Sequence, residues 1–334
     1  MLLFLGDVYL PWTVKCNFHI ETPYIFNLEG PITSQNQATC GKINLKMVSS
    51  LFTEVFGCNP IAVCLANNHI MDYDKEGLSD TLTNLKAHGI KFFGAGTLAE
   101  NCHNPLILEI DGFRVALLGY VCFSTHAIFV TNSTPGVRPI EKSVINDDIQ
   151  TAKKAGAQRI IVHLHWGTEL VSLPKWEDIQ TAEDIIAMGA DLIIGHHAHC
   201  IQPYQVWQRK HVYYGLGNCV FPLDRVPSNC QPDGDFKTFL VGKRGKQKSL
   251  AVQYDLATSS CRTFQLAFSN NTLYWQHEKQ GSWSPSGSRE CYATQYRKAE
   301  RMAIFHSLIS SFLNRPRFPR ISSVRKGLSR ANSH

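Results

Sequence analysis

Short apolar runs rich in β-branched residues alternate with stretches of helical periodicity along about the first 200 residues of the chain. The runs predict strands, and between them apolar residues recur at helical spacing within 47–55, 78–85 and 179–186. This alternation is typical of an α/β domain in which helices cover the sheet. The predicted strands are Leu2–Val8, Tyr24–Leu28, Ile61–Ala66, Lys91–Phe93, Phe113–Tyr120, Arg159–His165 and Asp191–Gly195.

Beyond Tyr204 the pattern is dominated by β runs. Residues Val206–Asn218 predict a hairpin that turns at Arg209-Lys210. Further short β runs in 237–276 are separated by Gly, Ser and Asn, and we expect them to form a second sheet or layer. Residues 293–313 predict an amphipathic helix, and the basic, proline-broken remainder predicts disorder.

These patterns divide the chain in two. We expect a core domain at 1–285, with the chemistry-bearing motifs in 1–222 and additional β elements in 223–285. Residues 286–334 would add the C-terminal amphipathic helix and tail. A chain of 334 residues with 44% hydrophobic and 18% charged residues is long and apolar enough to bury a core of this size.

The cysteines and the first residues of the chain indicate the cellular compartment of the protein. Eleven cysteines are scattered along the chain without a C-x-x-C pair, and an odd number cannot close a full set of intramolecular bridges. The opening run MLLFLGD is too short for a signal peptide or a membrane helix. We therefore expect reduced thiols and a cytoplasmic protein without a signal peptide or transmembrane segment.

The net charge of +6 comes from the C-terminal end of the chain. Residues 297–334 hold nine Lys or Arg against one acid, a surplus of eight positive charges. The rest of the chain therefore has a net charge near −2. Because the body is slightly acidic and shows no interleaving of aromatic and basic residues, no specific nucleic-acid binding is expected. The tail could instead contact an acidic membrane surface peripherally or an anionic polymer.

Polar residues that can bind metals or carry protons follow five of the predicted strands. In open α/β sheets, such residues gather beyond the carboxyl ends of the strands. A mixture of carboxylate, amide and imidazole donors suits Mn²⁺, Zn²⁺ or Fe²⁺, and the lack of clustered cysteine argues against a structural zinc site. We therefore predict a centre for one or two divalent ions. The residues are Asp7, Glu29, Asn67-Asn68-His69, His165 and the histidines of GHHAH at 195–199.

The spacing within these motifs suggests separate roles. In an extended conformation His197 and His199 would project to the same side and reach one ion, whereas His196 would face the other way and either bind the ion or form a hydrogen bond in the core. His163 lies deeper in its strand, where a buried, hydrogen-bonded histidine is expected. His69 is suited to protonate a leaving group. Asp72 would either support the site or cap the following helix.

The ordered motifs resemble a known family. They are GD at Gly6, NLEGPI from Asn27, ANNHIMDYDKEGLSDTL from Ala66, GAG from Gly94, HWGTE from His165, GADLIIGHHAHCIQP from Gly189 and YGLGNCVF from Tyr214. This set resembles the poly-γ-glutamate capsule-synthesis (CapA-type) family, which belongs to the calcineurin-like metallophosphoesterase superfamily.

The resemblance implies a four-layer α/β/β/α sandwich with two mixed sheets flanked by helices. The resemblance also implies roles for individual residues. At position 9 this sequence has a tyrosine, whereas the superfamily has a histidine at the corresponding position. The implied ligands are Asp7, Glu29, Asn68, His165, His197 and His199, with His69 as proton donor. Asn67, Asp72, Trp166, Glu169, His196 and Asn218 would support the site or face the substrate.

Two functions are compatible with this site. In the first, the protein is a metal-dependent hydrolase in which a metal-bound hydroxide attacks a phosphoester or a related bond. In the second, it is a non-catalytic assembly component that binds poly-γ-glutamate or another anionic polymer. Membership of a family would not decide between the two.

Overall fold

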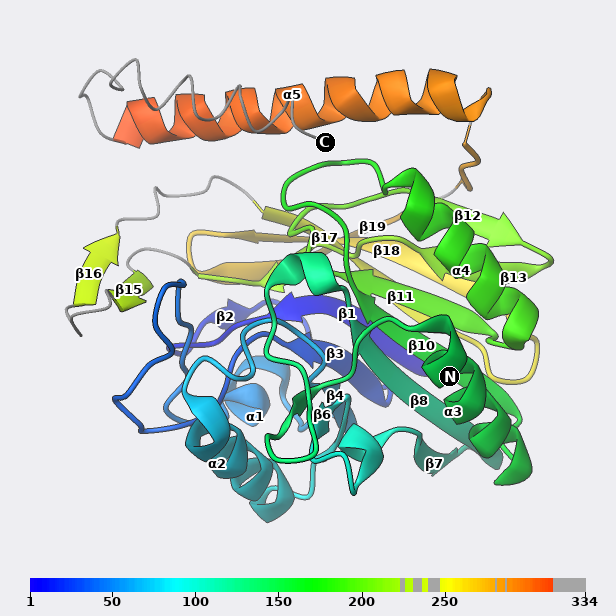
Figure 1. The fold of residues 1–334 in the computed structure, drawn as a ribbon, viewed down its shortest axis with the longest axis horizontal. Helices are drawn as coiled ribbons and strands as arrows, with labels where there is room; N and C mark the ends of the chain where they lie inside the picture. Colours follow the sequence, from blue (N-terminus) through cyan, green and yellow to red (C-terminus); the bar gives the residue numbers. More distant parts are fainter. Residues whose placement is uncertain (223–225, 231–235, 240–246, 280, 286, 315–334) are drawn as a thin grey trace.

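Two β-sheets packed face to face form the centre of the molecule (Figure 1). The computed structural model describes residues 1–222, 226–230, 236–239, 247–279, 281–285 and 287–314. Within these residues each sheet contains parallel and antiparallel strands. The sheets are therefore mixed, as the family resemblance implies.

The first sheet has a parallel half and an antiparallel half that meet at β1. Its strand order is β2-β19-β18-β17-β1-β3-β4-β5, and β14 pairs with β1 as well. Strands β1, β3, β4 and β5 are parallel neighbours, whereas β17, β18 and β19 are antiparallel. The bounds are β1 Leu2–Val8, β2 Lys15–Cys16, β3 Tyr24–Leu28, β4 Ala62–Cys64, β5 Lys91–Phe93, β14 Asn218–Val220, β17 Gln247–Tyr254, β18 Cys261–Ser269 and β19 Thr272–Lys279.

The second sheet is parallel in its centre, with an antiparallel strand at each edge. Its order is β12-β13-β11-β10-β8-β7. The bounds are β7 Leu106–Ile110, β8 Phe113–Val121, β10 Arg159–His165, β11 Leu192–His196, β12 Tyr204–Trp207 and β13 Lys210–Tyr213. Two short pairs lie outside the main sheets, β6 Ala95–Gly96 with β9 Gly136–Val137 and β15 Val226–Cys230 with β16 Phe236–Phe239.

Helices cover the outer face of each sheet. Strand β8 shows the layers, since Val115 and Leu117 face the first sheet while Ala116 and Leu118 pack with the buried residues of α3 and α4. Helices α1 and α2 cover the other side of the first sheet (Figure 1). The four-layer α/β/β/α arrangement is therefore confirmed. The bounds are α1 Phe52–Phe56, α2 Asp74–Ala87, α3 Lys142–Lys154, α4 Trp176–Met188 and α5 Arg289–Asn314.

Several predicted elements differ from the structure. The β runs at 247–279 do not form a second sheet, because β17 pairs with β1 and extends the first one. The hairpin turns at Gln208-Arg209, where both residues have positive φ, and Lys210 already belongs to β13. The helix predicted at 47–55 is limited to α1, since Met47 forms an isolated bridge to Ile32. Helix α3 and strand β7 were not predicted.

The close approach of β14 to β1 depends on a glycine. A β-carbon at Gly6 would lie 1.9 Å from the carbonyl oxygen of Gly217. Without that β-carbon, the amide of Asp7 donates a hydrogen bond to the Gly217 oxygen at 3.0 Å, and Asp7 lies beside Asn218 in the parallel pair. The turn at 216–218 is thereby held against the strand that carries Asp7.

Helix α5 lies along one end of the molecule and includes the predicted amphipathic helix (Figure 1). In the described part of the chain, none of the helices combines the length and apolar character needed to cross a membrane. The basic tail at 315–334, for which disorder and membrane contact were predicted, lies outside the described residues.

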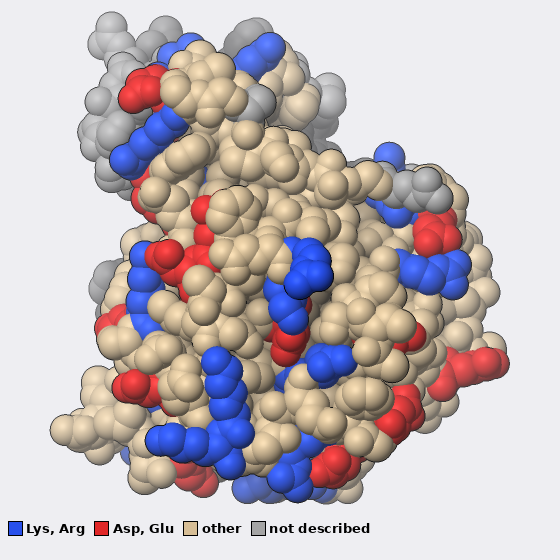
Figure 2. All heavy atoms as spheres, turned by 90° about the vertical axis from the view of Figure 1, so that its right-hand side faces the viewer, with Lys and Arg blue, Asp and Glu red and all other residues tan. Residues whose placement is uncertain are grey.

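On the side of α3 and α4, acidic and basic side chains are mixed (Figure 2), and the ion pair between Lys142 and Asp184 joins these two helices.

Candidate metal centre

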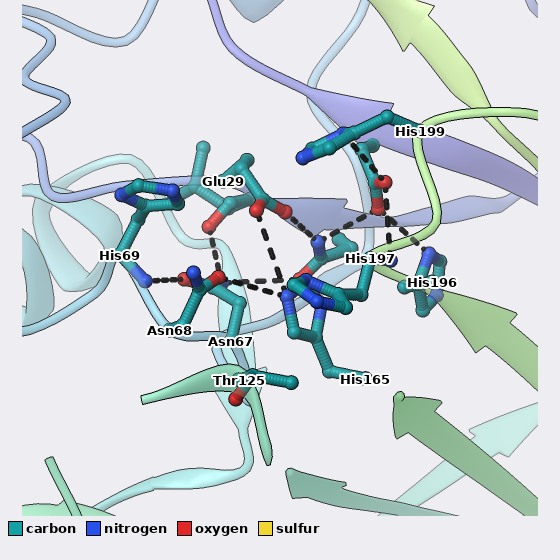
Figure 3. Close-up of polar contacts among 12 residues, drawn as sticks. Glu29, Asn67, Asn68, His69, Thr125, His165, His196, His197 and His199 are labelled. Atoms are coloured by element: carbon teal, nitrogen blue, oxygen red, sulfur yellow. Dashed lines mark hydrogen bonds and ion pairs between the residues drawn. The ribbon is translucent and has the colours of Figure 1, made fainter. Parts of the chain in front are cut away.

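The polar residues predicted from the strand ends lie together at one edge of the two sheets. Asp7 is in β1, Glu29 follows β3, and Asn68 follows β4 in the first sheet. His165 ends β10 and His197 follows β11 in the second sheet. Because these strands are parallel within each sheet, their carboxyl ends meet at the same edge. Figure 3 shows the side chains converging from these different strands.

Two buried carboxylates are held side by side by an asparagine. Asp7 and Glu29 have no exposed surface. The Nδ2 group of Asn27 donates hydrogen bonds to Asp7 Oδ1 at 2.9 Å and to Glu29 Oε2. Asn67 in turn donates to Asn27 Oδ1 at 3.1 Å and to the Leu28 carbonyl at 2.8 Å. The pair of carboxylates is thus positioned by neutral amides, which themselves add no positive charge.

His165 and Asn68 lie next to this pair. His165 Nε2 is 2.9 Å from Asn68 Oδ1 and 3.6 Å from Glu29 Oε1. His165 is fully buried, and its ring centroid lies 4.7 Å from that of His197. Residues from both sheets therefore meet across the interface between them.

Burial and neighbouring charges act differently on the two carboxyl groups. Burial raises the pKa of Asp7, but the hydrogen bond and charge of His196, with smaller effects of His199 and Asn27, outweigh it and hold the pKa below its ordinary value. For Glu29, burial and the negative charge of Asp7 together raise the pKa well above its ordinary value.

Burial also keeps the two imidazoles of the site neutral. It lowers the pKa of His165 well below the ordinary value, with a smaller effect from His197, and it lowers the pKa of His197 to about 4. Neutral imidazoles can donate a ring lone pair to a cation.

The histidine tract reaches the site by a different backbone conformation from the one expected. His197 and His199 have φ of 83° and 53°, so the tract is not extended and the argument from alternating sides is wrong. The tract nevertheless lies beside Asp7, to whose Oδ2 the His197 amide donates at 3.4 Å. His199 Nδ1 donates to Asn218 Oδ1 at 2.8 Å and is 3.6 Å from Asp7 Oδ2. The hydrogen bond to Asn218 thus orients the His199 ring.

His196 supports Asp7 by a hydrogen bond. Its Nδ1 lies 3.0 Å from Asp7 Oδ1, and its Nε2 lies 3.2 Å from His163 Nδ1. If Nδ1 donates to the carboxylate, Nε2 accepts from His163. His163 is buried, as predicted, and the three residues form a chain that leads away from the site.

His69 is held by Asp72 at the opening of the site. His69 Nδ1 is 2.7 Å from Asp72 Oδ2, and the histidine side chain is 11% exposed. Asp72 also accepts from the Leu45 amide at 2.7 Å and pairs with Lys42 at 2.6 Å. Helix α2 begins at Asp74 without a side-chain cap hydrogen bond, so Asp72 supports His69 and does not cap the helix.

Trp166 and Tyr9 do not face the site. Trp166 is 1% exposed and its indole nitrogen donates to the Tyr214 carbonyl at 2.9 Å, so the prediction that it could face the substrate is wrong. Tyr9 donates its hydroxyl to the Lys46 carbonyl at 3.3 Å, and burial raises its pKa to about 12. A protonated phenol with this partner is not a metal ligand.

The carboxylate and imidazole atoms that converge in the site fit a divalent cation. One ligand atom each from Asp7, Glu29 and His165 lies within 4.8 Å of the others, and Glu169, His197 and His199 form a second such group. Within the site, Glu29 Oε1, His165 Nδ1 and His197 Nδ1 are buried and have no hydrogen-bond partner among the residues that the structure describes. Buried polar atoms are rarely left unpaired, and carboxylate and imidazole donors suit Mn²⁺, Zn²⁺ or Fe²⁺.

The sequence analysis missed two residues that organise the site. Asn27 lies next to both carboxylates, and its place in NLEG, two residues before Glu29, is the signal that could have identified it. Lys42 donates to the Asn68 carbonyl and pairs with Asp72. It lies in the loop between the NLEGPI and ANNHIMDY motifs, outside both, and no local pattern indicates it.

Comparison with known proteins agrees with the motifs. Residues 14–223 match the family model described as bacterial capsule synthesis protein PGA_cap. The chain belongs to this family. The resemblance inferred from the ordered motifs is therefore confirmed.

Individual PGA_cap relatives match over part of their length. The capsule biosynthesis protein CapA of Bacillus anthracis is 33% identical over 160 residues, which cover 47% of this chain and 39% of that protein. The PGA biosynthesis protein CapA of Bacillus subtilis is 32% identical over 198 residues, which cover 58% of this chain and 52% of that protein. The chain thus spans about half the length of these relatives or less.

Solved structures show a weaker likeness. The NAD nucleotidase of Haemophilus influenzae has a TM-score of 0.38 and 13% sequence identity, with coverage of 92% of this chain and 60% of that chain. A likeness at this level carries no conclusion about the chemistry of the PGA_cap site.

Proposed function

We propose that this PGA_cap protein is a metal-dependent hydrolase that cleaves a phosphoester or a related bond during capsule polymer synthesis. The observation that supports the proposal most strongly is the buried group of Asp7, Glu29 and His165, whose ligand atoms lie within 4.8 Å of one another. Among the described residues no Lys or Arg pairs with these two adjacent buried carboxylates, so the charged form of both is costly unless a cation binds beside them. The polymer is proposed from the names of the relatives, which denote capsule and PGA biosynthesis.

The chain would contribute ligands and a proton donor. Asp7, Glu29, Asn68 and His165 would hold the cation. When bound, a divalent cation there would lower the pKa of a water and neutralise charge on a phosphoryl oxygen. Asp72 orients the His69 ring by accepting from Nδ1, which leaves Nε2 to pass a proton to the departing oxygen. The partial exposure of His69 allows a substrate to reach it.

The proposal is tested by turnover of metal-depleted protein to which Mn²⁺ is returned. Chromogenic phosphomonoester, phosphodiester and γ-glutamyl amide substrates cover the candidate bonds. We expect Mn²⁺-dependent cleavage that is lost in Asn68→Ala and falls about 10²–10⁴-fold in His69→Gln. Glu76→Gln, an exposed acid in the first turn of α2, is the matched control. Folded, Mn²⁺-loaded protein that cleaves none of these substrates would contradict the proposal.

A non-catalytic role in polymer assembly is the second candidate. It is favoured by the description of the family, which names capsule synthesis and no hydrolytic reaction. The same site would then bind carboxylate groups of an anionic polymer. Mn²⁺-dependent binding of poly-γ-glutamate without any cleavage would support this role, and cleavage in the assay above would exclude it.

A further inference from the structure

We propose that Lys42 binds an anionic oxygen of the substrate beside the metal centre, so that the site selects substrates with a negative charge next to the bond that is cleaved. This inference rests on the proposed function and extends it to the class of substrate. The oxygen can belong to a phosphoryl group or to the α-carboxylate of a γ-linked glutamate unit, because an ammonium group donates to both in the same way.

Lys42 lies at the edge of the sheets where the candidate ligands converge. It belongs to the segment between β3 and α1, which continues from the carboxyl end of β3. Its ammonium group donates to the Asn68 carbonyl and lies 2.6 Å from Asp72 Oδ1. The other oxygen of Asp72 lies 2.7 Å from His69 Nδ1. Lys42 thus contacts one residue on each side of His69 in the chain.

The loop around Lys42 is tied to Asp72 at both ends. The Thr39 amide donates to the Asp72 carbonyl at 2.8 Å, and the Leu45 amide donates to Asp72 Oδ2 at 2.7 Å. Between them, Nδ2 of the fully buried Asn44 donates to the carbonyls of Thr39 at 2.9 Å and Lys42 at 3.2 Å. Because these bonds fix the loop before a substrate arrives, little conformational entropy is lost on binding.

One donor of the ammonium group remains for a substrate. An ammonium group has three N–H donors, and in the described part of the chain those of Lys42 have two acceptors, the Asn68 carbonyl and Asp72 Oδ1. The Lys42 side chain is 20% exposed and that of His69 is 11% exposed, whereas Asp72 is fully buried. Lys42 and His69 therefore border the opening of the site, and a substrate oxygen that enters there reaches the third N–H.

Asp72 confines the effect of Lys42 to direct contact. The ion pair of the two residues is formally neutral, so it attracts a distant anion only weakly. An anionic oxygen that accepts from Lys42 Nζ still gains a charge-assisted hydrogen bond, and a neutral group in the same place gains less. Lys42 therefore distinguishes substrates by the group next to the cleaved bond and not by their total charge.

The test is calorimetric binding of small anions to full-length protein in the presence of saturating Mn²⁺. Phenylphosphonate presents phosphoryl oxygens, and N-acetylglutamate presents an α-carboxylate that its matched control, N-acetylisoglutamine, replaces with a neutral amide. We expect Lys42→Met to bind phenylphosphonate, N-acetylglutamate or both about 10–100-fold more weakly than the wild type, the effect of one hydrogen bond between charged groups. N-acetylisoglutamine should bind equally well to both proteins.

Two further variants isolate the cause. Lys42→Arg keeps a charged donor and should restore binding to within a few-fold of the wild type. Lys75→Met removes the same charge from an exposed position in the first turn of α2, and should bind all three ligands like the wild type. Thermal unfolding shows whether each variant is folded. A displaced Asp72 or His69 would weaken N-acetylglutamate and N-acetylisoglutamine alike, so this comparison separates a direct contact from a structural effect.

The three ligands identify the source of the oxygen. Loss of phenylphosphonate binding alone assigns it to a phosphoryl group, loss of N-acetylglutamate binding alone assigns it to the α-carboxylate, and loss of both supports a site for either anion. Folded Lys42→Met that binds both anions as tightly as the wild type overturns the proposal. Equal losses for N-acetylglutamate and N-acetylisoglutamine, or a wild type that binds neither anion, overturn it as well.

The result is independent of the turnover assay, because none of the three ligands contains a bond that the proposed hydrolase would cleave. Lys42-dependent binding by a protein that cleaves no substrate would remove the hydrolase and leave the anion site standing. Cleavage by the wild type together with unchanged binding in Lys42→Met would remove the anion site and leave the hydrolase standing.

Discussion

The hydrogen bond from His196 to Asp7 is expected to set the affinity of the buried site for its cation. His196 is 1% exposed, and its Nδ1 lies 3.0 Å from Asp7 Oδ1. His196→Ala removes this donor and leaves Asp7 with the hydrogen bond from Asn27 at 2.9 Å and a long contact of 3.4 Å from the His197 amide. The carboxylate then loses the contact that points it toward the site and favours its charged form.

The expected magnitude follows from that single contact. A hydrogen bond to a charged group contributes about 1.5–3 kcal/mol, and about 1.4 kcal/mol corresponds to a tenfold change in a binding constant. We therefore expect Mn²⁺ to bind His196→Ala about 10–100-fold more weakly than the wild type, which is also the range for residues that orient a metal ligand.

Titration calorimetry with Mn²⁺ measures the effect, and a variant that keeps a hydrogen-bond donor at this position isolates its cause. In His196→Asn the side-chain amide nitrogen can take the place of Nδ1, so this variant should bind Mn²⁺ within a few-fold of the wild type. Thermal unfolding without metal shows whether each variant is folded. If folded His196→Ala bound Mn²⁺ as tightly as the wild type, the supporting role of His196 would be refuted.

Two further predictions follow from the pKa of Glu29 and from the packing of α5. Because the pKa of Glu29 is raised well above its ordinary value, protons compete with the cation at this carboxyl group, and Mn²⁺ affinity should fall as the pH is lowered. An affinity in calorimetry that does not change with pH would contradict this. Tyr292 is 1% exposed, packs near Trp176 and donates to the Pro174 carbonyl, so Tyr292→Ala should lower the free energy of unfolding in urea by about 3–5 kcal/mol. Met302→Ala, at a position 47% exposed, should change it by about 0.5 kcal/mol or less, and equal losses in the two variants would argue against the packing.

The sequence alone was sufficient to predict the strand ends at which the candidate metal-binding residues lie. The buried strands β1, β3, β10 and β11 are nearly continuous apolar runs, so the polar residue that ends each run stands out. Asp7, Glu29 and His165 were identified in this way. Helix α3 was missed because Ile145, Ile149 and Ala152 are a short apolar stripe among polar residues.

The placement of strands in sheets was decided by tertiary contacts. The pattern of 247–279 predicts β-structure, but whether β17 pairs with β1 or starts another sheet depends on residues about 250 positions apart. Local propensity carries no information about such a pairing, since it depends on which open edge the rest of the fold leaves available.

The roles of the site residues also required the tertiary structure. Residue spacing indicates which side chains share a face only when the backbone conformation is regular, and His197 and His199 depart from it. Asn27, His196 and Glu169 acquire their roles through contacts with partners that lie elsewhere in the chain, His196 with Asp7 across 189 positions. The sequence therefore determined which kinds of donor atom lie at the strand ends. Packing of the two sheets decided which atoms meet, because the distances between remote side chains are set by the whole fold.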